Sequence, residues 1–358
     1  MAGTIILTGA NGSLGIHAAE QLLKAHPEFV TIFTVRNAAE SDANTESLRK
    51  VIARYPGSRA SIHQVDHANL SAIHEFASKI SSAITAGEYP PIKSIICNAA
   101  YWNLVADSEL TEDGYDKTLQ VSHIAHVALL LRLIGNFADS GRIVLLSSIG
   151  HYRRPNAMTS HLPEIPDNID QLNHPLPDKD KQGRGFQRYA NSKLVATTWM
   201  YALDHYLQQV SSTSCYMAHR DIPPVKCLPI NLYFQNRKFK NITVVAINPG
   251  GLGDSRVFTT NTPRSIQLTQ RFILKPFMWV INSLVDPTFR SSADAGVDVA
   301  ELAVGKARPG ERGYFTLLDK DESDPITRDP ELQQKVWQKS LEWAKITKDN
   351  TALKEAFK

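Results

Sequence analysis

The stretch that decides the fold is Thr8-Gly9-Ala10-Asn11-Gly12-Ser13-Leu14-Gly15, close to the N-terminus. It directly follows an apolar run at residues 4–7 and opens an amphipathic stretch at residues 14–24. Glycine permits a tight turn here, and the missing Cβ lets the backbone approach a pyrophosphate, which a helix N-terminus then stabilises. In this strand-turn-helix context the glycines favour nucleotide binding over a merely structural turn.

Outward from this turn, short apolar runs alternate with amphipathic stretches along the chain. Runs rich in Val, Ile, Phe and Thr predict strands at 5–8, 29–35, 60–65, 94–97, 142–147, 242–247 and 314–318. Three- and four-residue apolar spacing predicts helices at 14–24, 70–84, 112–137, 188–208, 293–304 and 331–346, with Thr111 and Ser292 as N-caps. We therefore predict an α/β fold with a doubly wound parallel sheet, whose ligand crevice lies beyond the carboxyl ends of the strands.

The domain prediction is one domain over residues 1–358 with two insertions. The Pro-rich polar stretches 152–187 and 211–240 exceed the roughly 12–15 residues of an ordinary structureless loop. We expect the first insertion near the active site and the second on the surface. Residues 251–290 include the apolar segment 272–285 and are predicted to form a lid over the substrate.

Composition excludes several classes of partner. The net charge of +3 with 21% charged residues gives no strong attraction to nucleic acid or to an anionic membrane. Cys97, Cys215 and Cys227 lack metal-ligand spacing, so no metal site is predicted. No run approaches the roughly 18 apolar residues of a membrane-spanning helix, and we expect a cytoplasmic protein. For residues 272–285, contact with a membrane surface stays open beside the lid.

A Tyr-x-x-x-Lys pair at Tyr189 and Lys193 indicates acid/base chemistry. Composition predicts fewer than one such pair by chance, and two occur. The other pair, Tyr89 and Lys93, encloses two prolines and cannot lie inside a helix. An i, i+4 spacing on a helix places Tyr189 and Lys193 on one face, where the ammonium is expected to lower the pKa of the phenol.

Two further positions complete the predicted site. Ser148 ends the strand 142–147 at the crevice, where its hydroxyl could bind a substrate carbonyl as the oxygen gains negative charge. Arg36 follows the second strand, where NAD-preferring folds usually carry Asp or Glu. A guanidinium there pairs well with a 2′-phosphate, which favours NADP(H), although Glu40 and Asp42 lie nearby.

Taken together, these residues resemble the short-chain dehydrogenase/reductase family. The resemblance covers nearly the whole chain through TGANGSLG at 8–15, Asp66, Asn98-Ala99-Ala100, Ser148, YANSK at 189–193 and Asn248-Pro249-Gly250. The segment QVSHIAH at 120–126 is similar to the branch that contains retinol dehydrogenases and protochlorophyllide reductases. The strings NPGGLGDSR and TGANGSLG also resemble reductases that tailor fungal secondary metabolites.

The resemblance implies a Rossmann fold and a role for each matched residue. Tyr189 would be the acid/base, Lys193 would hold the nicotinamide ribose, and Ser148 would orient the carbonyl. Cofactor contacts are implied for Gly9, Asn11, Gly12, Ser13, Leu14, Gly15, Arg36, Asp66, Asn98, Tyr189, Lys193, Pro249 and Gly250. Family members often form homodimers through the helices at 112–137 and 188–208, whereas the insertions could block that face here, so a homodimer and a monomer both stay open.

Three departures from the family pattern stand out. The glycine pattern is TGxxGxxG, with Gly12 in place of a glycine at Ser13, as in the epimerase-containing branch. Ser122 replaces the usual active-site Asn, so the proton relay through the site would change. Ala100 replaces the glycine of an Asn-Ala-Gly motif. His123 and His126, three residues apart without a third ligand, favour packing or exposure over metal binding.

The first functional hypothesis is an NADPH-dependent reductase that interconverts a carbonyl and an alcohol on a lipophilic small molecule. The insertion 152–187 and the segment 272–285 would cover its pocket. An isomerase or epimerase without net redox chemistry and a non-catalytic NADP-binding regulator are the alternatives. His151 and Tyr152 come directly after the strand that ends near Ser148. The sequence predicts equally that they line the substrate pocket or lie on a loop surface.

Overall fold

The apolar runs form an eight-stranded sheet in the computed structural model, which describes residues 2–156, 158–209 and 239–357. The strand order is β3-β2-β1-β4-β5-β6-β7-β8, and all pairs are parallel except β7 with β8. The strands are β1 (Thr4–Thr8), β2 (Val30–Val35), β3 (Arg59–Gln64), β4 (Ile92–Cys97), β5 (Phe137–Leu146), β6 (Thr243–Asn248), β7 (Gly313–Thr316) and β8 (Asp319–Lys320). This arrangement confirms the predicted doubly wound parallel sheet.

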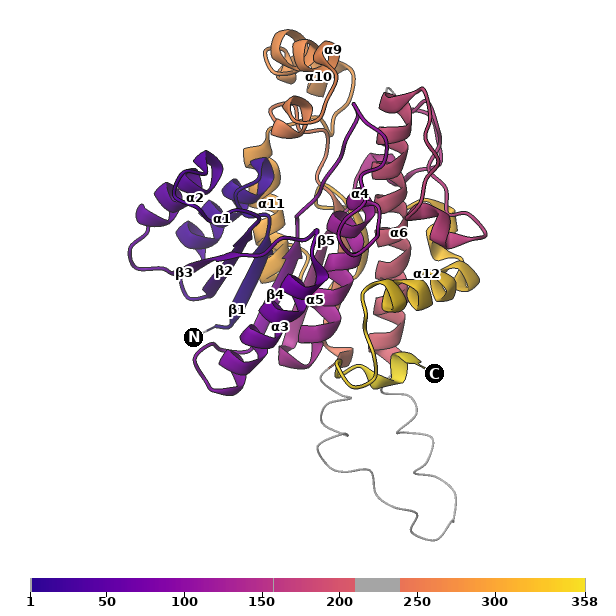
Figure 1. Cartoon of the computed structure of the whole chain (residues 1–358). Coiled ribbons are helices and arrows are strands. Elements are labelled where there is room, and N and C mark those ends of the chain that lie inside the picture. Colours follow the sequence, from indigo (N-terminus) through magenta and orange to yellow (C-terminus); the bar gives the residue numbers. More distant parts are fainter. Residues whose placement is uncertain (1, 157, 210–238, 358) are drawn as a thin grey trace.

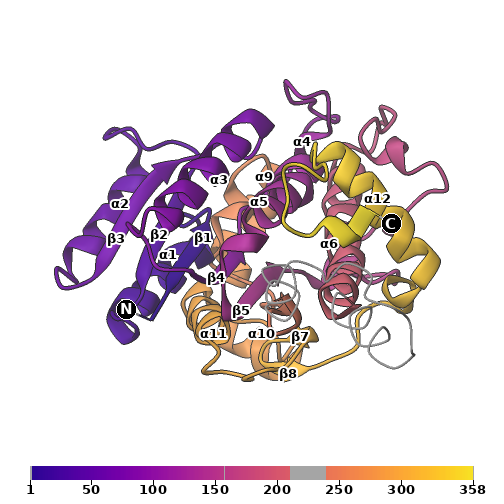
Figure 2. The same ribbon diagram turned by 90° about the horizontal axis from the view of Figure 1, so that it is seen from below.

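Helices cover both faces of the sheet (Figures 1 and 2). The cluster on one face includes α1 (Ser13–Ala25), α2 (Ala43–Ala53) and α11 (Ser292–Val304). The cluster on the other face includes α3 (Leu70–Thr85), α5 (Ala125–Leu133), α6 (Lys181–Gln209) and α12 (Pro330–Trp343). A short α4 (Lys117–Leu119) precedes α5, and α9 (Arg264–Thr269) and α10 (Met278–Leu284) stand beyond the carboxyl ends of the strands (Figure 1).

The buried strands explain why the apolar runs are continuous rather than alternating. Ile5 and Leu7 pack into the cluster with α1 and α11, whereas Ile6 between them packs into the cluster with α3 and α5. Successive side chains of a strand point to opposite faces, so both kinds of position must be apolar when helices cover both sides. All five residues of β1 are buried.

Several predicted boundaries are wrong for local reasons. The helix expected from Glu112 begins at Lys117, because Asp116 rather than Thr111 accepts the N–H of Leu119 as the N-cap. The cap of α11 is Ser291, one residue before the expected Ser292. Helix α6 begins at Lys181, inside the predicted insertion 152–187. Helix α2 was not predicted, since its exposed face leaves few apolar residues to reveal a period.

The helical stretch Lys117–Asn136 has the length and hydropathy of a membrane span, but 83% of its apolar window is buried inside the fold. Within it, Gln120–Ile124 form a turn of π-helix. Such turns are rare and occur often at functional sites. The predicted surface insertion 211–240 lies outside the described residues except for its last two positions.

Candidate active site

A cleft of about 1090 Å³ opens at the carboxyl ends of the strands. One end of the cleft lies at Arg36, directly after β2, and at Asp42, the N-cap of α2. From there the cleft passes the glycine turn and reaches Tyr189 and Phe289. Pockets for drug-sized ligands occupy roughly 300–1,000 Å³, so this cleft has room for a dinucleotide with part of a substrate. Every predicted site residue except Gly15 and Ser122 lines this cleft.

The glycine turn has the geometry that a pyrophosphate needs. Gly9 has φ +62°, and a Cβ on Gly15 would lie 2.4 Å from the carbonyl oxygen of Gly9. Gly12 is the N-cap of α1 and no side chain caps this helix, so its first N–H groups stay available to an anion. Ser13 and Leu14 line the cleft beside them. These residues fit a dinucleotide phosphate.

Asn98 joins the glycine turn to the central strands. Its Nδ2 donates to the carbonyl oxygens of Thr8 at 2.9 Å and Gly9 at 3.0 Å, while its backbone N–H donates to Oγ1 of Thr8 at 2.9 Å. Asp66 accepts the N–H of Ala68 at 2.9 Å and faces the cleft near the end of β3. Both residues line the cleft in which the family resemblance implies cofactor contacts.

Two arginines converge on the far end of the cleft. Arg36 is exposed and forms no hydrogen bond or ion pair within the described residues. Arg256 reaches over from the predicted lid and donates from its guanidinium to the carbonyl oxygen of Asn11 and to Asn44. The pKa of Asp42 is lowered first by the N–H of Thr45 that it accepts, and also by the charges of Arg36 and Arg256. This end is therefore suited to an anion.

Arg256 was missed by sequence reasoning. Its backbone N–H also donates to Oγ of Ser13 at 2.9 Å. Arg256 therefore makes two contacts with the glycine turn, to Ser13 and to Asn11, which lie 243 and 245 positions earlier in the chain. The only available signal was its position six residues after Gly250 in NPGGLGDSR. Gly250 itself has φ +89°, and a Cβ there would lie 2.1 Å from the carbonyl oxygen of Thr288.

Tyr189, Lys193 and Ser148 meet at the other end of the cleft. The ammonium of Lys193 lies 5.5 Å from the centroid of the Tyr189 ring and donates to the carbonyl oxygen of Leu146 at 2.6 Å. A hydrogen bond joins the side chains of Tyr189 and Ser148. The one-face placement expected from the i, i+4 spacing is thus present on α6.

The expected lowering of the Tyr189 pKa is wrong for the protein's own groups. Burial raises the pKa of Tyr189, and only the hydrogen bond with Ser148 opposes it. Burial also lowers the pKa of Lys193 to about 8, because a buried ammonium is poorly solvated. A positive charge on a bound nicotinamide is the additional influence that would lower the phenol pKa.

Ser122 lies in the π-helical turn between α4 and α5. Its buried hydroxyl accepts the backbone N–H of Tyr101 at 3.3 Å, and its carbonyl oxygen contacts Nδ1 of His126 at 3.3 Å. His123 is buried against Oγ of Ser340 at 2.8 Å. The described residues contain no cluster that could hold a metal ion, and the two histidines pack as expected.

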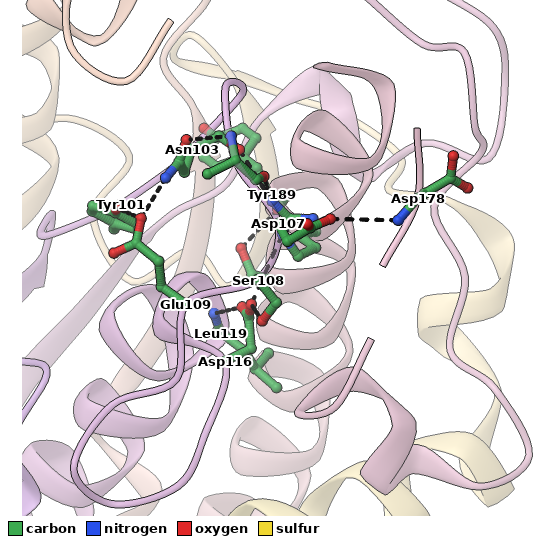
Figure 3. A network of polar contacts seen from close by, with 12 residues as sticks. Tyr101, Asn103, Asp107, Ser108, Glu109, Asp116, Leu119, Asp178 and Tyr189 are labelled. Atoms are coloured by element: carbon green, nitrogen blue, oxygen red, sulfur yellow. Dashed lines mark hydrogen bonds and ion pairs between the residues drawn. The ribbon is translucent and has the colours of Figure 1, made fainter. Parts of the chain in front are cut away.

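The loop after β4 forms one wall of the cleft and was also missed. The Trp102 ring lies edge-on to Tyr189 with centroids 5.7 Å apart, and its Nε1 donates to the carbonyl oxygen of Val257 at 2.9 Å. Glu109 holds the loop by accepting from Tyr101 at 2.7 Å and from Asn103 (Figure 3). The loop thus connects Tyr189 with the segment that follows β6.

The first insertion and the lid contribute side chains to the same cleft. From the insertion these are Asn156, Met158 and Phe186, and from the lid they include Leu252, Leu274, Ile281, Val285 and Phe289. His151 lies elsewhere: it is fully buried, and its Nε2 accepts the N–H of Asp324 at 3.1 Å. Tyr152 donates to the carbonyl oxygen of Glu322 at 2.7 Å. Neither residue lines the cleft.

Comparisons with known proteins agree with this geometry. Residues 3–160 match the short chain dehydrogenase family, and residues 256–353 match the AcuH dehydrogenase domain. The dehydrogenase acuH of Aspergillus aculeatus is 47% identical over 95 residues, which are 26% of this chain and 96% of that protein. The short-chain dehydrogenase iccH of Talaromyces variabilis is 26% identical and covers 98% of both chains.

Retinol dehydrogenase 13 of Mus musculus is 23% identical over 94% of this chain and 82% of that protein. Among solved structures, an uncharacterized protein from Mycobacterium paratuberculosis has a TM-score of 0.58 at 18% identity, covering 96% of this chain and 93% of that one. A metagenomic blue fluorescent protein in complex with NADPH has a TM-score of 0.51 at 18% identity, covering 88% and 96%. These likenesses confirm the predicted fold.

The fold and the site define an oxidoreductase that uses NAD(P)H. The chain belongs to the short-chain dehydrogenase/reductase family, as its motifs predicted.

Proposed function

We propose that this enzyme interconverts a ketone or aldehyde and an alcohol on a lipophilic small molecule, with NADP(H) as the redox partner. The observation that carries the proposal is the meeting of Tyr189, Lys193 and Ser148 at one end of a cleft whose other end holds a glycine turn and two arginines. Full-length similarity to iccH supports a place among reductases that tailor fungal secondary metabolites.

NADP(H) supplies or accepts the hydride when it is bound. Gly9, Gly12 and the first N–H groups of α1 would hold its pyrophosphate, and Lys193 would hold its nicotinamide ribose. Arg36 and Arg256 would hold the 2′-phosphate, because two guanidinium groups beside one anion form charge-assisted hydrogen bonds. The structure of the metagenomic protein with NADPH supports this choice of cofactor.

Tyr189 transfers the proton in the proposed reaction. During reduction the phenol donates its proton to the substrate oxygen, and during oxidation the phenolate accepts it. The hydroxyl of Ser148 orients that oxygen, since it already bonds the Tyr189 side chain. The ammonium of Lys193 lies 5.5 Å from the centroid of the phenol ring, where it would hold the nicotinamide ribose beside Tyr189.

The lining of the cleft near Tyr189 supports a lipophilic substrate. The rings of Trp102 and Phe186 lie against the Tyr189 ring, and the cleft is further lined by Val257, Phe258, Leu274, Ile281 and Phe289. Such surfaces favour apolar ligands, because their contact removes nonpolar area from water. Few polar side chains are then needed to orient the carbonyl.

Tyr189→Phe tests the proposed chemistry. We expect reduction of lipophilic ketones and aldehydes by NADPH to fall about 10²- to 10⁴-fold, the range that general acid catalysis contributes. The Kd of NADPH, measured by fluorescence titration, should change only a few fold. Tyr201→Phe is the control, because this tyrosine lies on the same helix but bonds Ser323 away from the cleft. Unchanged turnover in Tyr189→Phe would exclude the mechanism.

A further inference from the structure

The lid carries a concentrated apolar surface on its outer side. We define the lid surface as the exposed large hydrophobic residues Leu268, Phe272, Ile273, Phe277, Trp279, Leu284 and Val285, of which Val285 also lines the cleft. They are seven of the thirteen exposed large hydrophobic residues in the described part of the chain, and they lie within 18 positions. Trp279 is 73% exposed and Leu284 is 81% exposed. Scattered apolar residues need no explanation, whereas a contiguous group marks an interaction site.

The segment that carries this surface stands away from the sheet. Helices α9 and α10, joined by a π-helical turn at Gln270–Leu274, lie beyond the carboxyl ends of the strands and apart from both helix layers (Figure 1). No other described element packs over their outer side, since these hydrophobic residues remain about half exposed or more. Exposure of this kind in an otherwise well-packed fold indicates a surface that is covered during function.

The charge of the lid, residues 251–290, is mainly positive, with five basic residues against Asp254 and Asp286. Between Ser255 and Val285 the chain has no Asp or Glu, whereas it has four basic residues. Arg264, Arg271 and Lys275 are exposed, and none of them forms an ion pair within the described residues. The guanidinium of Arg271 lies 5.4 Å from the ring centroid of Phe272. Positive charge and aromatic rings are therefore interleaved on one surface.

The inner side of the same segment faces the cleft. Leu274 and Ile281, seven positions apart, line the cavity and are only half-buried. Phe272 and Trp279, also seven positions apart, point away from it and are exposed. The π-helical turn Gln270–Leu274 and helix α10 thus each contribute one of these residues to the cleft wall and one to the exposed side. One face of the lid contacts the cleft and the other lacks a partner in the described structure.

We propose that the lid surface binds to an anionic lipid membrane. The aromatic and aliphatic side chains would insert at the level of the headgroups, while Arg264, Arg271 and Lys275 contact anionic lipids, as in amphipathic helices that lie on membranes. A second copy of the chain fits less well, because it would bring the same unpaired positive charges face to face. Tyrosine and tryptophan are also favoured where a membrane meets water.

This binding would place the cleft beside the bilayer. Leu274 and Ile281 lie directly behind the proposed contact, so a lipophilic substrate could pass from the acyl chains to the cleft without crossing water. The membrane contact rests on the exposed lid surface and its charge, whereas the delivery of substrate rests on the proposed function. The two can therefore fail separately.

Vesicle binding by the full-length chain tests the proposal. We expect co-sedimentation with phosphatidylcholine vesicles that contain phosphatidylglycerol, weak binding to phosphatidylcholine alone, and a loss of binding at high salt. Trp279 provides a local readout, because the other four tryptophans, at 102, 199, 337 and 343, are buried. Its fluorescence should shift to shorter wavelength when mixed vesicles are added.

Variants distinguish the lid surface from a non-specific effect. Phe272→Ser with Trp279→Ser should weaken binding at least about tenfold, and Arg271→Gln with Lys275→Gln should remove the preference for anionic lipid. Leu176→Ser is the matched control, since Leu176 is 87% exposed outside the lid. NADPH affinity should be unchanged in all of them, because none of these residues lines the cleft.

Three results would overturn the membrane contact. The first is absence of binding to the mixed vesicles, and the second is binding that persists in the Phe272/Trp279 variant. The third is a concentration-dependent dimer in solution that the same variant abolishes without any vesicle binding, which would assign the surface to a second copy. A wild-type chain that binds vesicles yet reduces no carbonyl would contradict the proposed reaction and leave the membrane contact intact.

Discussion

Replacement of Arg36 by leucine tests how the cleft distinguishes the two nicotinamide cofactors. Arg36 is exposed at the end of β2 and has no partner within the described residues, so its removal should leave the fold intact. Its charge acts on Asp42 together with the charge of Arg256, which locates both guanidinium groups at one end of the cleft. A 2′-phosphate bound there would contact both.

The expected magnitude follows from the strength of one charge-assisted hydrogen bond. Such a bond contributes about 1.5–3 kcal/mol, which corresponds to roughly a 10- to 100-fold change in Kd. Arg36→Leu should therefore raise the Kd of NADPH by this factor and leave the Kd of NADH within a few fold. Arg256→Leu should weaken both cofactors, because Arg256 also holds the backbone of Asn11 in the glycine turn.

Fluorescence titration of both cofactors, with thermal unfolding to verify the fold, measures these effects. Arg54→Leu is the control, because Arg54 is exposed and its salt-bridge partner Glu20 lies outside the cleft. An equal loss of NADPH and NADH affinity in Arg36→Leu, or no loss of either, would refute recognition of the 2′-phosphate by Arg36.

Three further predictions concern the glycine turn and buried titratable groups. Gly15→Ala should raise the Kd of both cofactors at least about tenfold, because its Cβ would lie 2.4 Å from the carbonyl oxygen of Gly9. Gly57→Ala is the control, because there is open space around that glycine. Cofactor titration curves of Gly15→Ala that equal those of the wild-type chain would contradict the tight turn. Lys193→Met should raise the melting temperature at pH 7 while abolishing activity, because burial that lowers the Lys193 pKa from 10.5 to about 8 costs up to about 3 kcal/mol. The wild-type chain regains stability as pH rises from 8 to 10.5, so the advantage of the variant should shrink there, and an advantage that grows would be inconsistent with this account. Burial lowers the pKa of His123 to about 3, so its contribution to stability is present above pH 6.5 and is lost as pH falls toward 3. His123→Asn should therefore reduce the pH slope of the unfolding free energy by up to about 1.4 kcal/mol per pH unit in denaturant titrations. An unchanged slope would exclude this role for His123.

The parts of the site that sequence reasoning identified are those set by short spacings. Tyr189 and Lys193 share a helix face because they are four residues apart, and the glycines of the turn belong to one strand-turn-helix unit. Ser148 was found because the strand that precedes it is strongly apolar. Boundaries such as the start of α4 were missed because the N-cap at Asp116 begins the helix at Lys117, five residues later than the pattern indicated.

The amino-acid sequence by itself determined the class of fold, the glycine turn and the tyrosine-lysine pair, because each depends on local chain geometry and on the period of apolar residues. Only the tertiary structure brought Arg256 to Asn11 and Trp102 to Tyr189, since these contacts join segments more than 80 residues apart. It also decided that burial raises the Tyr189 pKa against the expectation from Lys193. Desolvation depends on everything packed around a group, and no spacing along the chain encodes it.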